Sequence, residues 1–380
     1  MSCFELGPIR PPSEAQSILL RLTRNCHWNK CAFCPVYKNQ QFSMRKADEI
    51  RRDIDVMSGI ADTIYRELNR RYPDRKDNSP VVHVIKDIDF GEGVDQGCAR
   101  QVAFWIYHGM KSLFLQDADA LVLRTGDLLE ILNYVREKFP TIERITTYSR
   151  AQTISRKTPE ELRALRQAGL NRIHIGMETG ADEVLALVNK GVTQEEQIRA
   201  GRNVVDAGFE LSQYFMPGLG GQEFTAENAV ESAKVLSRVN PTFIRIRSTI
   251  PVPGTPLHDM MEQGKWTTLT EEEKVREIRL FIEKLEGITS TVQSDHIMNL
   301  LEDVEGTLPG DKDRMLKVID SFLEMGLDDR ESFTVGRRIG RYRYLSDYVQ
   351  LFEVENIKRE IIRQYGSIDR GILEILTNFI

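Results

Sequence analysis

The chain has 380 residues, of which 41% are hydrophobic and 28% charged, and its formal net charge is −6 at pH 7. This globular composition, without an apolar run of about 18 residues or a secretory signal, excludes a membrane span and predicts a cytoplasmic protein. The negative charge offers no overall attraction to a phosphate backbone, so nucleic acid is not an expected partner.

Short β-branched and apolar runs alternate with longer segments of helical period over the first 255 residues. Capping residues at Thr158 and Thr193 begin two of the intervening helices, which are expected to end at Gly169 and Gly208. The alternation predicts an α/β fold with a parallel sheet, and periodicity alone leaves an open sheet and a barrel as alternatives. The expected strands are 18–23, 112–116, 145–148, 172–177, 211–216 and 243–250.

The regular spacing is interrupted once, by a long charged helix and irregular segments over residues 44–110. Strand signals fade after Leu257, and residues 270–380 are predicted to be helical. We therefore expect a core domain over residues 1–266, with an insertion at about 44–110, and a helical C-terminal region over 267–380.

Three of the five cysteines, Cys26, Cys31 and Cys34, form a C-x4-C-x2-C motif directly after the first expected strand. Thiolates suit iron–sulfur clusters or zinc. A structural zinc site needs a fourth ligand, which His27 is badly placed to provide, whereas a four-iron cluster on three cysteines keeps one iron open. Iron–sulfur is favoured and zinc remains the alternative. The isolated Cys3 and Cys98 are expected to have no role.

The motif resembles the signature of the radical S-adenosylmethionine (SAM) superfamily, C-x3-C-x2-C with an aromatic residue before the last cysteine, here Phe33. One extra residue separates the first two cysteines, so the loop must bulge around Trp28 and Asn29. The resemblance implies a partial (β/α)6 TIM-like barrel, a 4Fe–4S cluster and SAM as cofactors, and a flavodoxin- or ferredoxin-type electron donor. It also implies hydrogen abstraction from a substrate, here a small molecule that the sequence does not identify.

In this superfamily the segment after the second strand hydrogen-bonds the methionine end of SAM, so the resemblance implies that Gln116, Asp117 and Asp119 contact the cofactor. The third strand ends in a hydroxyl and a guanidinium, Ser149 and Arg150, which are further candidates. A guanidinium is a natural bidentate partner for the carboxylate of SAM. The alternatives are that the acidic residues cap the next helix and that Arg150 is solvated.

In the fourth strand, His174, Gly176 and Glu178 share one face because side chains alternate along a strand. This segment resembles the fourth-strand motif of coproporphyrinogen dehydrogenases and methylthiotransferases, in which the glutamate contacts the cofactor. The resemblance therefore implies that Glu178 contacts SAM. His174 is a second candidate contact, and a hydrogen-bonded core histidine is the alternative.

The fifth strand leads into a glycine-rich turn in which Met216 and Gly218 are candidate cofactor contacts. On the sixth, Arg245 and Arg247 share one face and suit the carboxylate of SAM or an anionic substrate. The following Pro253–Leu257 string resembles the one that closes the barrel in the same subgroup.

The sequence thus predicts a radical SAM enzyme. One alternative is a non-enzymatic iron–sulfur or zinc protein. The other is an RNA-modifying radical SAM enzyme, which would use the basic run Arg337–Tyr344 to bind RNA. For that run, a surface helix docked on an acidic barrel is the simpler interpretation.

Overall fold

The computed structural model describes residues 3–90 and 93–377, and the chain divides into two compact units. Unit 1 comprises Met1–His27, Asn39–His174 and Asp206–Phe209, and unit 2 comprises Trp28–Lys38, Ile175–Val205 and Glu210–Ile380. The predicted α/β fold is confirmed, because the chain forms a mostly parallel eight-stranded sheet in the order β1-β4-β5-β6-β7-β8-β9-β10.

In unit 1, strands β1 (Ile18–Arg21), β4 (Ser112–Gln116) and β5 (Arg144–Ser149) are parallel neighbours. Strand β6 (Leu170–Glu178) begins in this unit and ends in unit 2. Arg21 pairs in register with Gln116, so the carboxyl ends of β1 and β4 lie side by side. A short antiparallel ribbon of β2 (Thr23–Arg24) and β3 (Ser43–Met44) follows β1.

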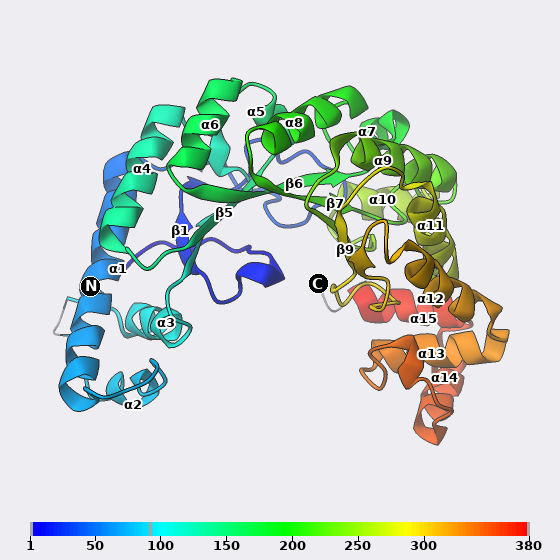
Figure 1. The fold of residues 1–380 in the computed structure, drawn as a ribbon. Helices are drawn as coiled ribbons and strands as arrows, with labels where there is room; N and C mark the ends of the chain where they lie inside the picture. Colours follow the sequence, from blue (N-terminus) through cyan, green and yellow to red (C-terminus); the bar gives the residue numbers. More distant parts are fainter. Residues whose placement is uncertain (1–2, 91–92, 378–380) are drawn as a thin grey trace. The chain divides into compact units, whose positions relative to one another are not determined.

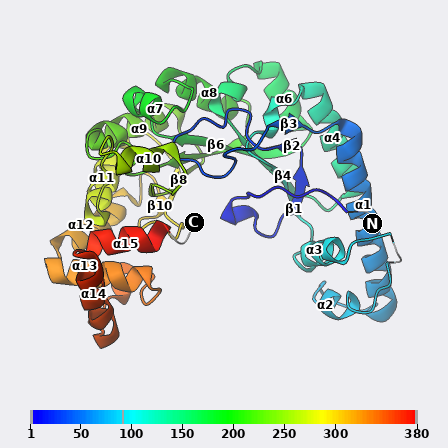
Figure 2. The same ribbon diagram turned by 180° about the vertical axis from the view of Figure 1, so that it is seen from behind.

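The helices of unit 1 include the long charged helix expected within residues 44–110. Helix α1 (Ala47–Arg71) buries Ile50, Ile54, Met57 and Ile64 at helical spacing, and it packs against α3 and α4 (Figure 2). The remaining helices are η1 (Pro12–Glu14), α2 (Val81–Val84), α3 (Gln96–Tyr107), η2 (Ala120–Val122), α4 (Thr125–Lys138), α5 (Ala151–Ile154) and α6 (Pro159–Gln167).

In unit 2, strands β7 (Glu210–Phe215), β8 (Phe243–Ile246) and β9 (Thr291–Gln293) are parallel, and β10 (Gly306–Thr307) pairs with β9 in the antiparallel sense. Helices α13, α14 and α15 form a group at the end of the chain (Figure 1). The helices are α7 (Asp182–Leu187), α8 (Gln194–Asp206), α9 (Thr225–Val239), α10 (Pro256–Glu262), α11 (Glu271–Lys284), α12 (Lys312–Glu324), α13 (Leu327–Arg338), η3 (Leu345–Asp347), α14 (Phe352–Tyr365) and α15 (Ile368–Thr377). In the described part of the chain, no helix has the length and apolarity to cross a membrane.

The all-helical prediction for residues 270–380 is wrong at two places, β9 and β10. Strand β9 has three residues, and only Val292 of them is fully buried, so it is too short to show an alternating pattern. Strand β8 is also shorter than expected and ends at Ile246. The sequence therefore predicted the last strand about 40 residues before the strands actually end, because β9 and β10 are too short to give a recognisable pattern.

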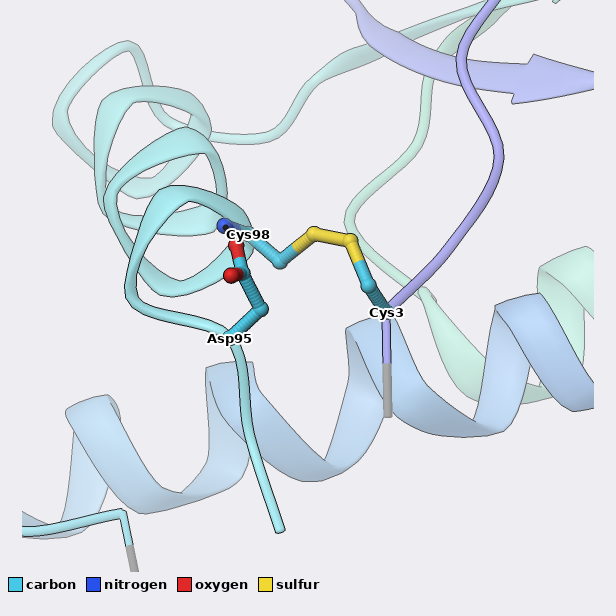
Figure 3. A group of neighbouring side chains, drawn as sticks. All are labelled: Cys3, Asp95 and Cys98. Atoms are coloured by element: carbon cyan, nitrogen blue, oxygen red, sulfur yellow. Dashed lines mark hydrogen bonds between the residues drawn. A yellow bond between two sulfur atoms is a disulfide. The ribbon is translucent and has the colours of Figure 1, made fainter. Parts of the chain in front are cut away.

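The expectation that Cys3 and Cys98 have no role is also wrong, because the two form a disulfide within unit 1 (Figure 3). Their Cα atoms lie 5.9 Å apart, and 95 residues separate them in the sequence. Asp95 lies beside the pair and caps α3 by accepting a hydrogen bond from the Cys98 amide at 3.0 Å. The disulfide fastens the N-terminal segment to the first turn of α3.

Candidate active site

The first part of the cysteine loop is held by the acidic residue that follows β4. The Asn25 amide donates to the Asp117 carboxylate at 3.2 Å, and Arg21 Nε donates to the same carboxylate at 2.6 Å. Asn25 has a φ of 69°, a left-handed conformation that asparagine tolerates better than most residues. Asp117 thus fixes the turn that leads into Cys26.

His27, the residue after Cys26, contacts two of the predicted site residues. Its Nε2 lies 2.9 Å from Asp119 Oδ2, and Ser149 Oγ donates to Asp119 Oδ1 at 2.7 Å. The Thr153 hydroxyl donates to the same carboxylate. The buried Asp119 and Ser149, predicted separately after different strands, therefore meet in one cluster with the partly exposed His27, whose position the sequence did not reveal.

The next segment of the loop, residues 28–38, belongs to unit 2 and contains the predicted bulge. Asn29 adopts a φ of 44°, and its side chain donates to the Tyr37 carbonyl at 2.5 Å. The Trp28 indole donates to the Asn189 carbonyl at 2.8 Å, and its ring lies where a side chain at Gly191 would be. The extra residue of the motif is accommodated by this left-handed turn.

The segment around the last two cysteines is anchored to unit 2 by backbone hydrogen bonds. Ala32 donates to Val188 at 2.8 Å and accepts from Leu257 at 3.0 Å. Phe33 packs against the hydrophobic cluster that includes Ala32, Val188 and Leu257, and the Lys190 ammonium lies 5.9 Å from the centroid of the Phe33 ring. The Pro253–Leu257 string thus supports the cysteine loop, because Thr255 caps α10 and Leu257 binds Ala32.

Cys26, Cys31 and Cys34 carry thiols rather than disulfides, and all three are partly exposed. Lys38 Nζ donates to the Cys31 carbonyl at 2.9 Å, which places a positive charge beside this segment. The donor set fits a three-thiolate iron–sulfur ligand set.

The side chain of Gln116 is occupied by the N-terminal segment. Its Oε1 accepts from the Gly7 amide at 2.9 Å, and its Nε2 donates to the carbonyls of Gly7 and Ile9. Glu5 in the same segment pairs with Arg21 and Arg24. The structure therefore gives Gln116 a role in fixing the N-terminal segment near the ends of β1 and β4.

Arg150 and His174 are both buried in unit 1. Arg150 precedes α5, the helix that contributes Thr153 to the Asp119 cluster. The His174 ring contacts Tyr148 edge to face, with ring centroids 5.5 Å apart. His174 therefore lies in an aromatic environment at the point where β6 passes into unit 2.

Glu178 ends β6 in a left-handed conformation with a φ of 62°, and its carboxylate forms an ion pair with Lys190. Both side chains are largely buried, at 12% and 8% exposure. The Glu178 carbonyl accepts from the Met216 amide at 2.8 Å, so Glu178 and Met216 are adjacent. Lys190 was not predicted as a site residue, because a lysine in a loop carries no distinguishing pattern.

The glycine-rich turn after β7 rests on a buried glutamate of α11. The Gly218 amide, at a φ of 80°, donates to Glu277 Oε1 at 3.1 Å, and Asn228 donates to the same atom at 2.6 Å. Burial raises the pKa of Glu277 to about 7, although its hydrogen bonds oppose this rise. Sequence reasoning missed Glu277 because it lies on a helix with eight other charged residues.

Arg245 and Arg247 face a loop that follows β9. Arg245 is 5% exposed and pairs with Asp295 at 3.2 Å, whereas Arg247 is exposed. Burial and the nearby charge of Arg247 lower the pKa of His296 to about 4, so this imidazole is neutral at pH 7.

The basic run of α13 and its following loop is paired internally. Arg337 and Arg343 contact Glu302, Arg338 contacts Glu271, and Arg341 contacts Glu353. All of these glutamates lie within residues 267–380, so the docking of this run on an acidic barrel stays a prediction.

Comparison with known proteins found a superfamily model that matches part of the chain after the cysteine loop. The model of the radical SAM superfamily matches residues 97–233. A tRNA uridine(34) acetyltransferase of Methanocaldococcus jannaschii is 26% identical over 122 residues, which are 30% of this chain and 22% of that protein. A biotin synthase of Porphyromonas gingivalis is 29% identical over 184 residues, which are 48% of this chain and 51% of that protein.

Among solved structures, a coproporphyrinogen III oxidase from Escherichia coli, described as a radical SAM enzyme, is similar with a TM-score of 0.45 at 17% identity. The alignment covers 71% of this chain and 52% of that one. The chain thus spans between about a fifth and a half of the length of these curated relatives.

Proposed function

Because residues 97–233 match the model of the radical SAM superfamily, we propose that this protein is a radical SAM enzyme whose Cys26, Cys31 and Cys34 hold a 4Fe–4S cluster. The observation that carries the proposal is the cysteine loop itself. Its three thiols are partly exposed, its extra residue is accommodated by the left-handed Asn29, and it precedes the matched region.

A cluster held by the three cysteines would supply the electron for reductive cleavage of the sulfonium of SAM, the chemistry that precedes hydrogen abstraction from a substrate. That electron comes from a flavodoxin- or ferredoxin-type donor. The chain's own residues position these groups: Asp117 holds the start of the cysteine loop, Asp119 holds His27, and Lys38 and Lys190 place positive charge near the last two cysteines and Phe33.

The contacts of the cofactor-binding residues that the sequence predicted divide them into two groups. Phe33, Arg150, Glu178, Met216 and Gly218 are candidates to touch SAM. Gln116, Asp117, Asp119 and Ser149 act through the segments that they bind. His174 remains a candidate contact, and Arg245 and Arg247 are considered below.

The test is anaerobic reconstitution with iron and sulfide, followed by reduction with dithionite in the presence of SAM. We expect a brown protein that releases 5′-deoxyadenosine, and a Cys31→Ala variant that releases none. Cys98→Ser is the matched control, because this cysteine lies outside the motif and its variant should retain cleavage. A colourless protein that binds zinc and does not cleave SAM would instead support the non-enzymatic alternative.

RNA modification is the second candidate, because two of the similar proteins are named tRNA uridine(34) acetyltransferases. The arginines of residues 337–343 are paired with glutamates, so this run does not favour RNA. Binding of bulk tRNA that weakens steeply between 50 and 200 mM salt would support this candidate. Over that range, proteins that bind nucleic acid through several phosphate contacts lose about 10³-fold or more in affinity. We expect no such binding and propose a small-molecule substrate.

A further inference from the structure

A row of polar side chains crosses three neighbouring strands of unit 2. Tyr214 of β7 is in register with Arg245 of β8, and Arg245 is in register with Gln293 of β9. Residues in register on parallel strands present their side chains on the same face, and the strands lie about 4.8 Å apart. A phenol, a guanidinium and an amide therefore stand side by side.

The loop after β9 is held firmly beside this row. Asn299, which is fully buried, accepts from the Ser248 amide at 2.9 Å and donates to the Ile246 carbonyl at 2.8 Å. From α13, Arg338 donates to the carbonyls of Ile297 and Met298 at 2.8 and 3.1 Å. These contacts fix Asp295 and His296 next to the end of β8.

The row contains buried polar atoms that no described residue satisfies. Arg245 Nε and Gln293 Oε1 are buried and have no hydrogen-bond partner within the described chain. Leaving such atoms unpaired costs about 1 to 3 kcal/mol each, so native proteins almost always pair them, often with a ligand or water. One of these atoms is a charged donor and the other is a neutral acceptor.

More donors lie at the end of the row. Arg247 follows two residues after Arg245 and is exposed. His296 Nδ1 accepts from the Met298 amide at 3.2 Å, which assigns the proton of the neutral ring to Nε2. The site thus offers to an anion the Arg245 Nε, which is unpaired within the described chain, together with the Arg247 guanidinium and one ring N–H. Arg245 Nη1 pairs with Asp295, and the site offers one amide oxygen to a neighbouring donor.

We propose that this row, Arg245 and Gln293 with Arg247 at its end, binds the substrate of the proposed radical reaction through a carboxylate and an adjacent ammonium or hydroxyl. The substrate class is a small α-amino or α-hydroxy acid. The carboxylate accepts hydrogen bonds from the guanidiniums, whose planar fork of donors matches its two oxygens. The α-substituent donates to Gln293 Oε1. This inference rests on the proposed function and names the substrate class of that site.

SAM also carries an α-amino carboxylate, so the experiment must distinguish binding of a substrate acid to this row from binding of the SAM carboxylate to it. L-alanine and L-lactate are the probes, and ethanolamine, which has no carboxylate, is the control ligand. Each is titrated into the reconstituted, SAM-saturated protein and followed by saturation-transfer NMR. The affinity for SAM is measured in parallel by equilibrium dialysis.

Alanine and lactate should bind to the unmodified protein and ethanolamine should not. Arg245→Met should weaken both acids at least about tenfold, the loss of one charge-assisted hydrogen bond, and leave SAM affinity unchanged. Arg238→Met is the matched control, because Arg238 pairs with Glu195 on exposed helix surfaces. Gln293→Leu, at a partly exposed position, repeats the test if Arg245→Met does not fold.

Three results would overturn the proposal: binding of ethanolamine as tight as that of alanine, no binding of either acid, or a loss of SAM affinity with alanine affinity intact. The last result would assign the row to the cofactor carboxylate. Release of 5′-deoxyadenosine without added substrate is scored separately, so failure of the proposed function is distinguishable from failure of this inference.

Discussion

His27 Nε2 lies 2.9 Å from Asp119 Oδ2, so the residue next to the first cysteine of the motif is tied to the loop after β4. Two hydroxyls, of Ser149 and Thr153, orient the same carboxylate. Mutation of a residue that holds a metal-binding segment in place, without itself binding the metal, typically lowers metal affinity about 10- to 100-fold.

Asp119→Asn should therefore reduce the retention of iron by the reconstituted protein. Asparagine keeps the size of the side chain but has one acceptor oxygen where aspartate has two, so the turn at His27 loosens. Iron retained per chain during competition with a chelator, and the electron paramagnetic resonance spectrum of the reduced protein, measure the effect. Asp127→Asn, on an exposed helix turn, is the control. An unchanged spectrum and unchanged iron retention would contradict the role given to Asp119.

Glu277 should make stability depend on pH. Its pKa is 4.5 in the unfolded chain and about 7 in the folded one, so its contribution is fully present below pH 4.5 and is lost as pH rises through 7. The loss is about 3 kcal/mol at most, by the conversion of a pKa difference into free energy.

Glu277→Gln removes this dependence, because the amide stays neutral at all pH values. Urea unfolding at pH 5 and pH 8 should show a smaller difference for the variant than for the unmodified protein. Glu283→Gln, an exposed position on the same helix, should behave like the unmodified protein. Equal pH dependence in Glu277→Gln and the unmodified protein would show that Glu277 is already charged in the folded state.

Lys190→Met should destabilise the fold more than removal of a surface lysine does. Lys190 and Glu178 are at most 12% exposed, and a buried carboxylate that loses its cation costs about 3 to 5 kcal/mol. Lys234, paired with Glu231 on an exposed face of α9, provides the comparison, and Lys234→Met should cost less than about 1 kcal/mol. Urea unfolding measures both. Equal losses in the two variants would mean that the Glu178 carboxylate has other sources of stabilisation.

Asn299→Ala should loosen the loop after β9. The change leaves the Ser248 amide and the Ile246 carbonyl buried without their partner, at a cost of about 1 to 3 kcal/mol. Hydrogen exchange of residues 294–299 should become faster, while exchange in α9 stays the same. Asn356→Ala, at an exposed position where the side-chain oxygen accepts from Arg359, should leave exchange in the loop unchanged. Protection of residues 294–299 equal to that in the unmodified protein would contradict the anchoring role of Asn299.

The strands that the sequence predicted well are those with a strong apolar signal. Residues 112–116 form β4 as expected, and the capping box at Thr158 begins α6, which ends before Gly169 at a φ of 102°. Local chemistry determines these features. Strand β9 could not be predicted, because it depends on pairing with the free edge of β8 rather than on its own three residues.

Candidate site residues could be predicted where one residue type has one clear use. The cysteine motif, Asp119 and Glu178 were predicted because thiols and carboxylates at strand ends are distinctive, and their roles in a site stay predictions. Lys190 and Glu277 escaped because their importance lies in the partners they meet after folding, Glu178 and Gly218. The sequence around a single charged residue on a loop or a charged helix does not indicate which partner that residue contacts in the folded protein.

The Cys3–Cys98 disulfide means that this chain is not one covalent species under all conditions. Thiol reagents such as dithiothreitol, which accompany the assembly of oxygen-sensitive clusters, also open disulfides by exchange. Protein prepared in air and protein prepared with thiols under nitrogen would then differ by two hydrogen atoms and by one cross-link at the N-terminus. Their masses, electrophoretic mobilities and protease maps should be compared only after the oxidation state of this pair has been recorded.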